Sequence, residues 1–406
     1  SMTELTAREL LLHLYQSAVD AVDGRYLVAR WLSDNRDQAS QYSHCVAIGK
    51  AAAAMLEGAC DQCPSIKASL LICPPDKITP KQSRDDSITC VGSSHPVPDE
   101  RSLEAGRQLV RFLSGLQESD RVLFLISGGT SALVEVLTDG LTLEDLQAIN
   151  RYLLSSGKDI HRMNAWRQQF SMIKGGGLLH YLHNPATLLL ISDVEADRME
   201  FIGSGLLVKT DAEPDQDEYL ESFSRRLPRS FPGHDSAALD DSLVEAYIIG
   251  NLDVAKQAVH DAALAEGLDS TIHGEFIGGD VEQAARHLHE QLENLQAGVH
   301  VWGGEPTVRL PDKPGIGGRN QALALYFARH IQDRPGIHLL SGGTDGVDGS
   351  GNSAGGVVSM YTLQKAAKMG IDVDAELAKA NSGVVLMATD DLVPRQDSNT
   401  NVMDVI

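Results

Sequence analysis

The sequence lacks a long apolar segment. Its longest apolar runs, at 122–126 and 188–191, have the length of β-strands and fall far short of the roughly 20 residues that cross a bilayer. No basic segment followed by an apolar run opens the chain, so no signal peptide is predicted. We therefore expect a cytoplasmic protein with no membrane partner.

Positive charge is also scarce. The 406 residues include 34 Lys and Arg against 56 Asp and Glu, which gives a net charge of −22. A general nucleic-acid binder needs a basic surface that displaces counterions, so no nucleic-acid partner is expected. An anionic small molecule stays compatible with this composition, because a few cations beside backbone amides can outweigh a distant acidic surface. Each Lys or Arg next to a glycine loop is therefore informative.

Two common nucleotide-binding motifs are missing, and cysteine is sparse. The chain contains neither GxxxxGK followed by Ser or Thr nor GxGxxG, which disfavours a P-loop NTPase and ordinary dinucleotide binding. All 5 cysteines lie in the first quarter of the chain. Cys60 and Cys63 have redox or zinc spacing, but a zinc site would need a second matched pair. We interpret the cysteines as free thiols.

The chain alternates apolar strands with helical patterns. Apolar residues recur at helical spacing over the first ~35 residues, and again after residue 131 with an interruption at 155–157. Strands are predicted at 45–48, 69–73, 121–126 and 188–191 in the first part, and near 270–273, 299–302 and 337–340 in the second. Unbroken apolar strands between helices are typical of a parallel sheet covered on both faces.

A change in composition marks the predicted domain boundary. Residues 213–235 are rich in acidic residues and proline, and the Ala-rich helix predicted at 252–265 follows them. We expect two α/β domains, covering residues 1–235 and 236–406. The first should have a Rossmann-like parallel sheet with helices on both faces.

Glycine and polar residues follow several of the predicted strands. They form the segments Gly49-Lys50, Ser127 to Ser131, Ser192-Asp193, Gly303-Gly304-Glu305 and Ser341 to Gly349. Ligands of parallel α/β sheets bind at the carboxyl ends of strands, where glycine lets backbone N–H groups approach an oxyanion. The two Ser-Gly-Gly-Thr loops share only a local pattern, so no duplicated fold is indicated. This pattern predicts a protein that binds phosphate groups.

Two cations stand beside these loops. Lys50 opens a predicted helix, where the helix dipole disfavours a cation unless an anion shares the site. Arg319 lies in a Gly-Gly-Arg-Asn segment, from which it could clamp a phosphate with two hydrogen bonds. A solvated surface position is the alternative for either residue.

Carboxylates also follow the strands. Asp193, Glu305, Asp345 and Asp348 could coordinate Mg²⁺ or accept a proton from a substrate hydroxyl, although each could instead cap a helix. Together with phosphate loops they suggest phosphoryl transfer. His95, in a proline-braced loop, is a further candidate for substrate contact.

The ordered segments of this chain resemble the two-domain glycerate 2-kinase family, whose C-terminal domain is called MOFRL. The matching segments are Ala47 to Met55, His95 to Asp99, Ser127 to Leu133, Asp159 to His161 with Asn164, Ile173 to Gly177, Ser192 to Val194, Gly303 to Glu305, Gly317 to Gln321, Gly343 to Gly349 and Asn399 to Val402. They run through nearly the whole chain.

The resemblance implies ATP- and Mg²⁺-dependent phosphorylation of D-glycerate to 2-phosphoglycerate in a cleft between two α/β domains, the second with a mixed sheet. It implies Lys50 and Arg319 as catalytic cations. From its place at a strand end we also predict Asp193 as a catalytic residue, and the roles of base and metal ligand stay open between Asp193 and Asp345. The predicted phosphate-binding residues are Gly49, Ser127, Gly128, Gly129, Ser131 and Lys174. The predicted substrate-binding residues are His95, Glu305, Asn320 and Asp345, and the predicted metal ligands are Asp193 and Asp345.

Some positions depart from the family pattern. Thr130 replaces a usual glycine, Glu195-Ala196 replaces Pro-Gly, and Leu206 replaces a proline. A glycine-rich C-terminal loop of the family is replaced by residues 393–401. Two alternatives therefore stay open: a hydroxypyruvate reductase, a label that some relatives carry, and a catalytically silent homologue that binds a nucleotide or metabolite. The expected partners are ATP and a small hydroxy acid, and the chain is expected to be a monomer or homodimer.

Overall fold

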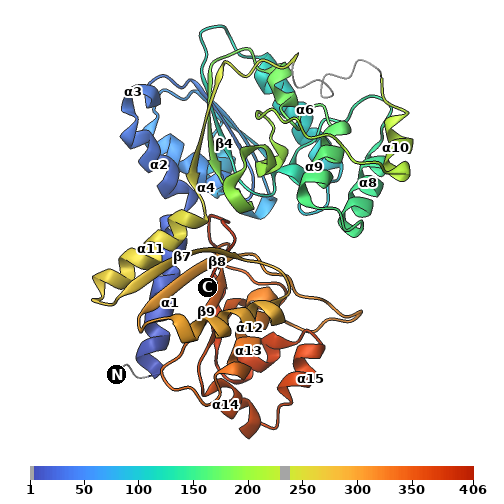
Figure 1. The fold of residues 1–406 in the computed structure, drawn as a ribbon. Coiled ribbons are helices and arrows are strands. Elements are labelled where there is room, and N and C mark those ends of the chain that lie inside the picture. The colour runs from blue at the N-terminus through green and yellow to red at the C-terminus, as the bar shows by residue number, and fades with distance from the viewer. Residues whose placement is uncertain (1–3, 229–237) are drawn as a thin grey trace. The chain divides into compact units, whose positions relative to one another are not determined.

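The computed structural model describes residues 4–228 and 238–406. The chain forms two compact units: residues 24–249 make one, and residues 1–23 together with 250–406 make the other (Figure 1). The predicted boundary between residues 235 and 236 lies outside the described residues. The units are described separately below.

Both ends of the first unit differ from the predicted domain of residues 1–235. The predicted N-terminal helix is two helices, α1 (Glu4–Ala21) and α2 (Gly24–Asp34), and the division between the units falls between them. Helix α1 packs against α11 (Leu252–Ala265) and strand β9 (Leu339–Gly343) of the second unit, because its buried side, which includes Leu14 and Ala18, faces them. At the other end, β6 (Val244–Gly250) joins the sheet of the first unit.

The first unit contains a six-stranded sheet with the order β3-β2-β1-β4-β5-β6. Besides β6, its strands are β1 (His44–Ile48), β2 (Ala68–Cys73), β3 (Ile88–Gly92), β4 (Val122–Ile126) and β5 (Ala186–Ile191). Strands β1 to β5 pair in parallel. The strand order reverses between β1 and β4, which is the switch point of a doubly wound fold.

Helices cover both faces of this sheet, as predicted. The helices of the first unit after α2 are α3 (Arg36–Ala39), α4 (Ala52–Gln62), α5 (Pro80–Arg84), α6 (Glu100–Ser114), α7 (Thr130–Leu133), α8 (Leu143–Ser155), α9 (Ile160–Gln169) and α10 (Glu218–Ser224). Val46 and Phe124 pack in one core cluster with Leu109 of α6. Because side chains alternate along a strand, the intervening residues face α4, which contacts β1, β2 and β4. The core of the unit therefore lies on both sides of the sheet.

The second unit has a mixed sheet with the order β11-β10-β9-β12-β8-β7. Its strands besides β9 are β7 (Ser270–Ile277), β8 (Val299–Gly304), β10 (Ser353–Val358), β11 (Leu392–Pro394) and β12 (Asp404–Val405). The short strand β12 is antiparallel to both β8 and β9, so these two strands run in the same direction. The loops that follow them therefore leave the same edge of the sheet.

Helices α1 and α11 pack on the strands β9, β8, β7 and β12, and α13 packs on β9 and β10. The helices of this unit after α11 are α12 (Val281–Gln291), α13 (Arg319–His330), α14 (Thr362–Lys368), α15 (Val373–Ala378) and α16 (Ser382–Ala388). The predicted helix at 252–265 is confirmed by α11. Within the described residues, no helix is long and apolar enough to cross a membrane.

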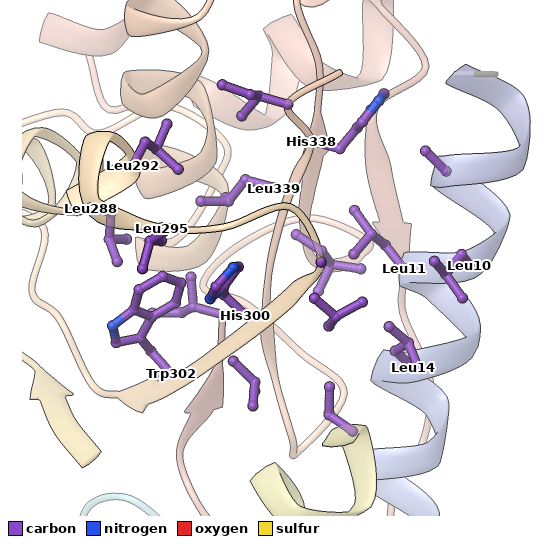
Figure 2. A pocket seen from close by; sticks show the side chains of 18 of the residues that line it. Leu10, Leu11, Leu14, Leu288, Leu292, Leu295, His300, Trp302, His338 and Leu339 are labelled. Atoms are coloured by element: carbon purple, nitrogen blue, oxygen red, sulfur yellow. The ribbon is translucent and has the colours of Figure 1, made fainter. Parts of the chain in front are cut away.

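The second unit also contains an apolar cavity of about 670 Å³ that is partly open to solvent (Figure 2). Leucines from α1, α12 and β9 line it, with His300 and Trp302 of β8 beside them. The lining residues of β8 and β9 belong to the beginnings of these strands. The glycine loops follow the opposite, carboxyl ends, so this cavity is separate from the loops to which the sequence points.

Candidate functional site

Three adjacent strands of the first sheet end in the predicted phosphate loops. Gly49 and Lys50 follow β1, the first Ser-Gly-Gly-Thr loop follows β4, and Asp193 follows β5 by one residue. Because β1, β4 and β5 are neighbours and run in parallel, these segments meet at one edge of the sheet. That edge includes the switch point, where ligands of such sheets bind.

The turn after β1 lies directly against the first Ser-Gly-Gly-Thr loop. Gly49 has φ = +131°, and a Cβ atom there would clash with the Ser127 hydroxyl. The Lys50 amide donates a hydrogen bond to the Gly128 carbonyl (2.9 Å), and the Ala51 amide donates to the Ser127 hydroxyl (3.1 Å). Glycine at residue 49 is therefore required by a positive φ and by the close approach of the two loops.

Three ionisable side chains surround the glycines of this loop. A Cβ at Gly129 would lie 3.1 Å from both His95 Cδ2 and Lys50 Cγ, and one at Gly128 would lie 2.5 Å from Asp193 Oδ2. The structure thus brings together Lys50, His95 and Asp193, which lie far apart in the sequence. Bare glycine backbone beside a lysine is suited to binding phosphate oxygens.

Burial shifts the pKa values of two of these groups. It lowers the pKa of His95 to about 4, and the nearby positive charge of Lys50 acts in the same direction. Burial raises the pKa of Asp193, although Lys50 opposes this shift. At neutral pH His95 is therefore an uncharged imidazole, while Asp193 has a higher proton affinity than an exposed aspartate.

Thr130, a departure from the family pattern, holds the first Ser-Gly-Gly-Thr loop in place. It is fully buried, and its hydroxyl contacts the Ser127 carbonyl at 2.8 Å and the Ile48 carbonyl at 3.2 Å. A glycine could make neither contact. The next residue, Ser131, accepts a hydrogen bond from the Ser204 hydroxyl at 2.9 Å. The loop is thus tied both to β1 and to the segment η4 (Met199–Ser204).

Lys174, predicted to bind phosphate, is not among the cations that face the strand ends. Its ammonium pairs with Glu135 at 2.5 Å, and the two side chains are only 5% and 2% exposed. The Ser171 hydroxyl also donates to Glu135. Because this buried carboxylate neutralises its charge, Lys174 has a structural partner rather than an open position for a phosphate.

In the second unit, the carboxyl ends of β8 and β9 form a second polar site. Arg319, the first residue of α13, donates to the Asp404 carboxylate through Nε (2.6 Å) and Nη2 (2.9 Å). Asp404 lies on β12 opposite Gly304 and Gly343, between the ends of β8 and β9. Glu305, which follows β8, lies 3.7 Å from the Arg319 guanidinium.

Asp404 is a site residue that sequence reasoning missed. Its side chain is fully buried whereas that of Arg319 is 32% exposed. Burial raises the pKa of Asp404 to about 6, and the hydrogen bonds and charge of Arg319 oppose this rise. Burial lowers the pKa of Arg319, but its bonds to Asp404 outweigh that effect and raise it overall. The sequence pattern that could have indicated Asp404 as a buried residue is its position among apolar neighbours, in Val402-Met-Asp-Val-Ile406.

The second Ser-Gly-Gly-Thr loop places Asp345 beside β9. A Cβ at Gly343 would lie 2.8 Å from Asp345 Oδ1, and the Val347 amide donates to that oxygen at 3.2 Å. Tyr15 of α1 donates its hydroxyl to the Gly343 carbonyl at 2.6 Å. Burial and the charge of Asp345 raise the pKa of Tyr15. Helix α1 therefore supports this loop directly.

Asn320, predicted to bind substrate, uses its side chain for hydrogen bonds within the chain. It is fully buried, its amide nitrogen donates to Asp348 at 3.2 Å, and its amide oxygen accepts from Ser341 at 2.7 Å. Asp348 also accepts from the backbone amides of Asn320 (3.0 Å) and Gln321 (2.9 Å). Asp348 therefore caps the start of α13, and Asn320 fixes that helix end to β9.

The unusual C-terminal loop packs on the second Ser-Gly-Gly-Thr loop. The Ser398 hydroxyl donates to the Thr344 carbonyl at 2.8 Å, and the Gln396 amide donates to the Gly346 carbonyl at 3.1 Å. A Cβ at Gly346 would clash with the Gln396 carbonyl. Residues 393–401 thus take part in shaping the loop that contains Asp345.

The two predicted metal ligands belong to different units, Asp193 to the first and Asp345 to the second. Within residues 4–228 and 238–406, no group of three or more His, Cys, Asp and Glu side chains is arranged to hold a metal ion. Mg²⁺ is commonly held by one or two carboxylates together with substrate phosphates and water. Each of the two carboxylates, taken by itself, is of the kind that Mg²⁺ uses in such a phosphate-dependent site, and the described residues form no cage of protein ligands.

A doubly wound sheet with glycine loops at its switch point is typical of α/β proteins that bind phosphate-bearing ligands. Residues 10–229 match the family described as a domain of unknown function, DUF4147, and residues 298–404 match the MOFRL family. The chain is 33% identical over 343 residues to the glycerate 2-kinase of Pyrococcus horikoshii, which covers 79% of this chain and 77% of that protein.

Two further similarities span nearly the full length. A protein of Agrobacterium vitis with the provisional name hydroxypyruvate reductase is 31% identical over 424 residues, covering 99% of this chain and 94% of that protein. The crystal structure of the glycerate kinase of Thermotoga maritima matches with a TM-score of 0.84 and 27% identity, over 98% of both chains. The chain therefore belongs to the glycerate 2-kinase family, which confirms the resemblance and the α/β fold class.

The Glu135–Lys174 pair should contribute strongly to the stability of the first unit. Glu135→Leu leaves the buried ammonium of Lys174 without its partner, so we expect the free energy of unfolding to fall by about 3 kcal/mol or more. Adding Lys174→Met removes the unpaired charge and should restore most of that loss. Urea denaturation followed by circular dichroism measures both variants. A double variant no more stable than Glu135→Leu would contradict this account.

The lowered pKa of His95 predicts a pH-dependent stability difference between the wild type and His95→Gln. Its pKa is about 4 in the folded chain and about 6.5 when unfolded, so between these values the unfolded chain binds more protons. The stability of the wild type relative to the variant should therefore rise by roughly 2 kcal/mol from pH 4 to pH 6.5 and then level off. Urea denaturation across this range measures it, and a constant difference would contradict burial of a neutral His95.

Proposed function

We propose that this chain transfers the γ-phosphoryl group of ATP to a hydroxyl group of D-glycerate and so forms 2-phosphoglycerate. The observation that carries the proposal is the pair of glycine-lined strand ends, each with one cation, Lys50 in the first unit and Arg319 in the second. Relatives named glycerate 2-kinase and glycerate kinase support the same reaction. Phosphoryl transfer depends mainly on positioning and on neutralising charge, which these groups could supply.

Lys50 and the first Ser-Gly-Gly-Thr loop are suited to the phosphate chain of ATP. Among the described residues the Lys50 ammonium has no carboxylate within ion-pair distance, so its charge is available to an anion. The loop adds backbone N–H groups around Gly128 and Gly129, where no side chain blocks the approach of a phosphate oxygen. Ser131 at the end of this loop is a further donor to phosphate.

Arg319 is held in one orientation by Asp404. The Asp404 carboxylate accepts hydrogen bonds from Nε and Nη2 of the Arg319 guanidinium. The N–H groups of Nη1 can therefore donate to another acceptor. A fork whose direction is fixed can bind a phosphate or carboxylate without a large loss of side-chain entropy. We assign Arg319 to charge stabilisation during transfer, with Glu305 and Asp345 as candidate contacts to substrate hydroxyls.

Asp193 is the best candidate for the general base. Burial raises its pKa, and it lies beside the same loop as Lys50, so it can accept the proton of an attacking hydroxyl group near the phosphates. His95, which is uncharged at neutral pH, can orient the substrate through a hydrogen bond. Mg²⁺, when bound with ATP, would neutralise phosphate charge. With Asp193 as the base, Asp345 is the residue proposed to hold the metal; Asp193 would hold it only in place of acting as the base.

A second candidate function is binding without turnover. The observation that favours it is the C-terminal loop, whose residues 396–398 bond to the loop of Asp345 in place of the family's glycine-rich segment. Two results together would favour this candidate. ADP or ATP would raise the melting temperature, and no hydroxy acid would cause the release of ADP from ATP. Oxidation of NADH by hydroxypyruvate would instead favour the reductase, whose dinucleotide fingerprint is missing from the sequence.

The kinase proposal predicts ADP release from ATP and Mg²⁺ in the presence of D-glycerate. A coupled ADP assay over D-glycerate, L-glycerate and tartronate should give the highest kcat/KM with D-glycerate. Lys50→Met should lower kcat on the order of 10²-fold or more, because a cation that stabilises the transition state is lost. Lys81→Met, at an exposed lysine, serves as the matched control. No turnover with any of the three acids would overturn the proposal.

A test of Arg319 must not leave the buried Asp404 carboxylate without a partner. We expect Arg319→Gln combined with Asp404→Asn to keep the fold and to lower kcat on the order of 10²-fold or more. Asp404→Asn alone keeps the cation and should have the smaller effect on kcat. Equal losses in both proteins would mean that the orientation set by Asp404, and not the charge itself, limits the reaction.

A further inference from the structure

Helix α9 has two faces of different character. Trp166 packs in an apolar cluster with Leu153 and Leu220 on one face. Asn164, Arg167 and Gln168 stand at i, i+3 and i+4, so they share the other face. This polar face is unusual because its side chains are largely enclosed: Asn164 is 2% exposed and Gln168 is 5% exposed.

The amide groups of this face lack hydrogen-bond partners. Among the described residues, neither Asn164 Nδ2 nor Gln168 Nε2 has an acceptor, and both atoms are shielded from solvent. A buried donor without an acceptor costs about 1–3 kcal/mol. Two such donors lie four residues apart on one face of one helix, and an acceptor from outside the chain would satisfy both.

Arg167 adds a positive charge between the two amides. Its side chain is half-buried, and in the part of the chain that the structure describes its guanidinium has neither a carboxylate nor a hydrogen-bond acceptor. Burial lowers the pKa of Arg167, which reflects the cost of a desolvated charge. The chain carries a net charge of −22, so an arginine without a carboxylate at such a position is notable.

The polar face of α9 is connected to the first Ser-Gly-Gly-Thr loop through Gly175 and Ser204. A Cβ at Gly175 would lie 2.7 Å from Gln168 Cδ, and the Gly175 amide donates to the Ser204 carbonyl at 3.0 Å. The Ser204 hydroxyl in turn donates to the Ser131 hydroxyl at 2.9 Å. Helix α9 also packs on η4, the segment that ends at Ser204. A chain of direct contacts therefore connects Gln168 with the end of the phosphate loop.

We propose that Asn164, Arg167 and Gln168 form an anion-binding subsite that takes a phosphate or carboxylate group of a ligand. Asn164 Nδ2, Gln168 Nε2 and the Arg167 guanidinium are N–H donors without a partner in the described chain, and the planar fork of Arg167 suits both groups. The subsite's role in catalysis rests on the proposed kinase function: its anion is either a phosphate of the nucleotide or the carboxylate of the hydroxy acid. Anion binding itself does not require turnover.

The test compares Arg167→Gln with Arg162→Gln, a change at an exposed arginine of the same helix. Melting temperatures are measured without ligand and with inorganic tripolyphosphate or D-glycerate, and dissociation constants are measured by calorimetry. Without ligand, Arg167→Gln should melt no lower than the wild type, because it removes an unpaired charge. It should bind one of the two probes at least about tenfold more weakly, whereas Arg162→Gln should match the wild type.

The two probes separate the sources of the anion. Weaker binding of tripolyphosphate assigns the subsite to the nucleotide phosphates, and weaker binding of D-glycerate assigns it to the substrate carboxylate. Arg167→Lys keeps the charge without the fork and should fall between the wild type and Arg167→Gln.

Arg167→Gln that binds both probes within twofold of the wild type would overturn the subsite. A lower melting temperature with unchanged binding would likewise show a structural arginine. Loss of binding in an enzyme without kinase activity would sustain the subsite while the kinase proposal fails.

Discussion

The close approach of two loops at the end of β1 is the constraint on which the candidate site depends. Residue 49 must be glycine because the Ser127 hydroxyl occupies the space of a Cβ, and the turn needs a positive φ. The resulting contact between the Lys50 amide and the Gly128 carbonyl fixes the lysine beside the glycines of the next strand's loop. His95 and Asp193 reach the same two glycines from other strand ends. One backbone contact thus assembles side chains from four separate stretches of sequence.

The second unit also holds a cation at the end of its strands, but through a buried carboxylate and not through a contact between two loops. A two-residue strand, β12, places the buried Asp404 between the ends of β8 and β9, and this carboxylate fixes the direction of Arg319. In the first unit Lys50 lies beside glycine backbone. In the second unit Asp404 holds Arg319 and bonds to only two of the three guanidinium nitrogens. Lys50 is therefore suited to following a flexible phosphate chain, and Arg319 to a group in one set position.

Local patterns predicted the framework well, and contacts between distant residues explain what they missed. Unbroken apolar strands such as 122–126 predicted the parallel sheet, and glycine after them predicted the loops. Asn320 and Lys174 looked like ligand contacts because they stand in glycine-rich segments, yet Asp348 and Glu135, from distant positions, bind them. The position of α1 in the second unit could not be predicted either, because it depends on packing against α11 and β9 and not on the helical pattern itself.

Four cations lie near glycine segments: Lys50, Arg167, Lys174 and Arg319. They differ chiefly in whether a carboxylate pairs with them, and we expect those without such a partner to bind an anion more readily. Glu135 neutralises Lys174 completely, so a further anion there would add to a buried negative charge. Asp404 occupies one edge of Arg319 and leaves the other. Lys50 and Arg167 have no ion-pair partner among the described residues, so no direct ion pair competes with an anion for their charge. In a chain as acidic as this one, we therefore infer binding cations from the absence of a carboxylate within ion-pair distance rather than from a glycine-rich sequence.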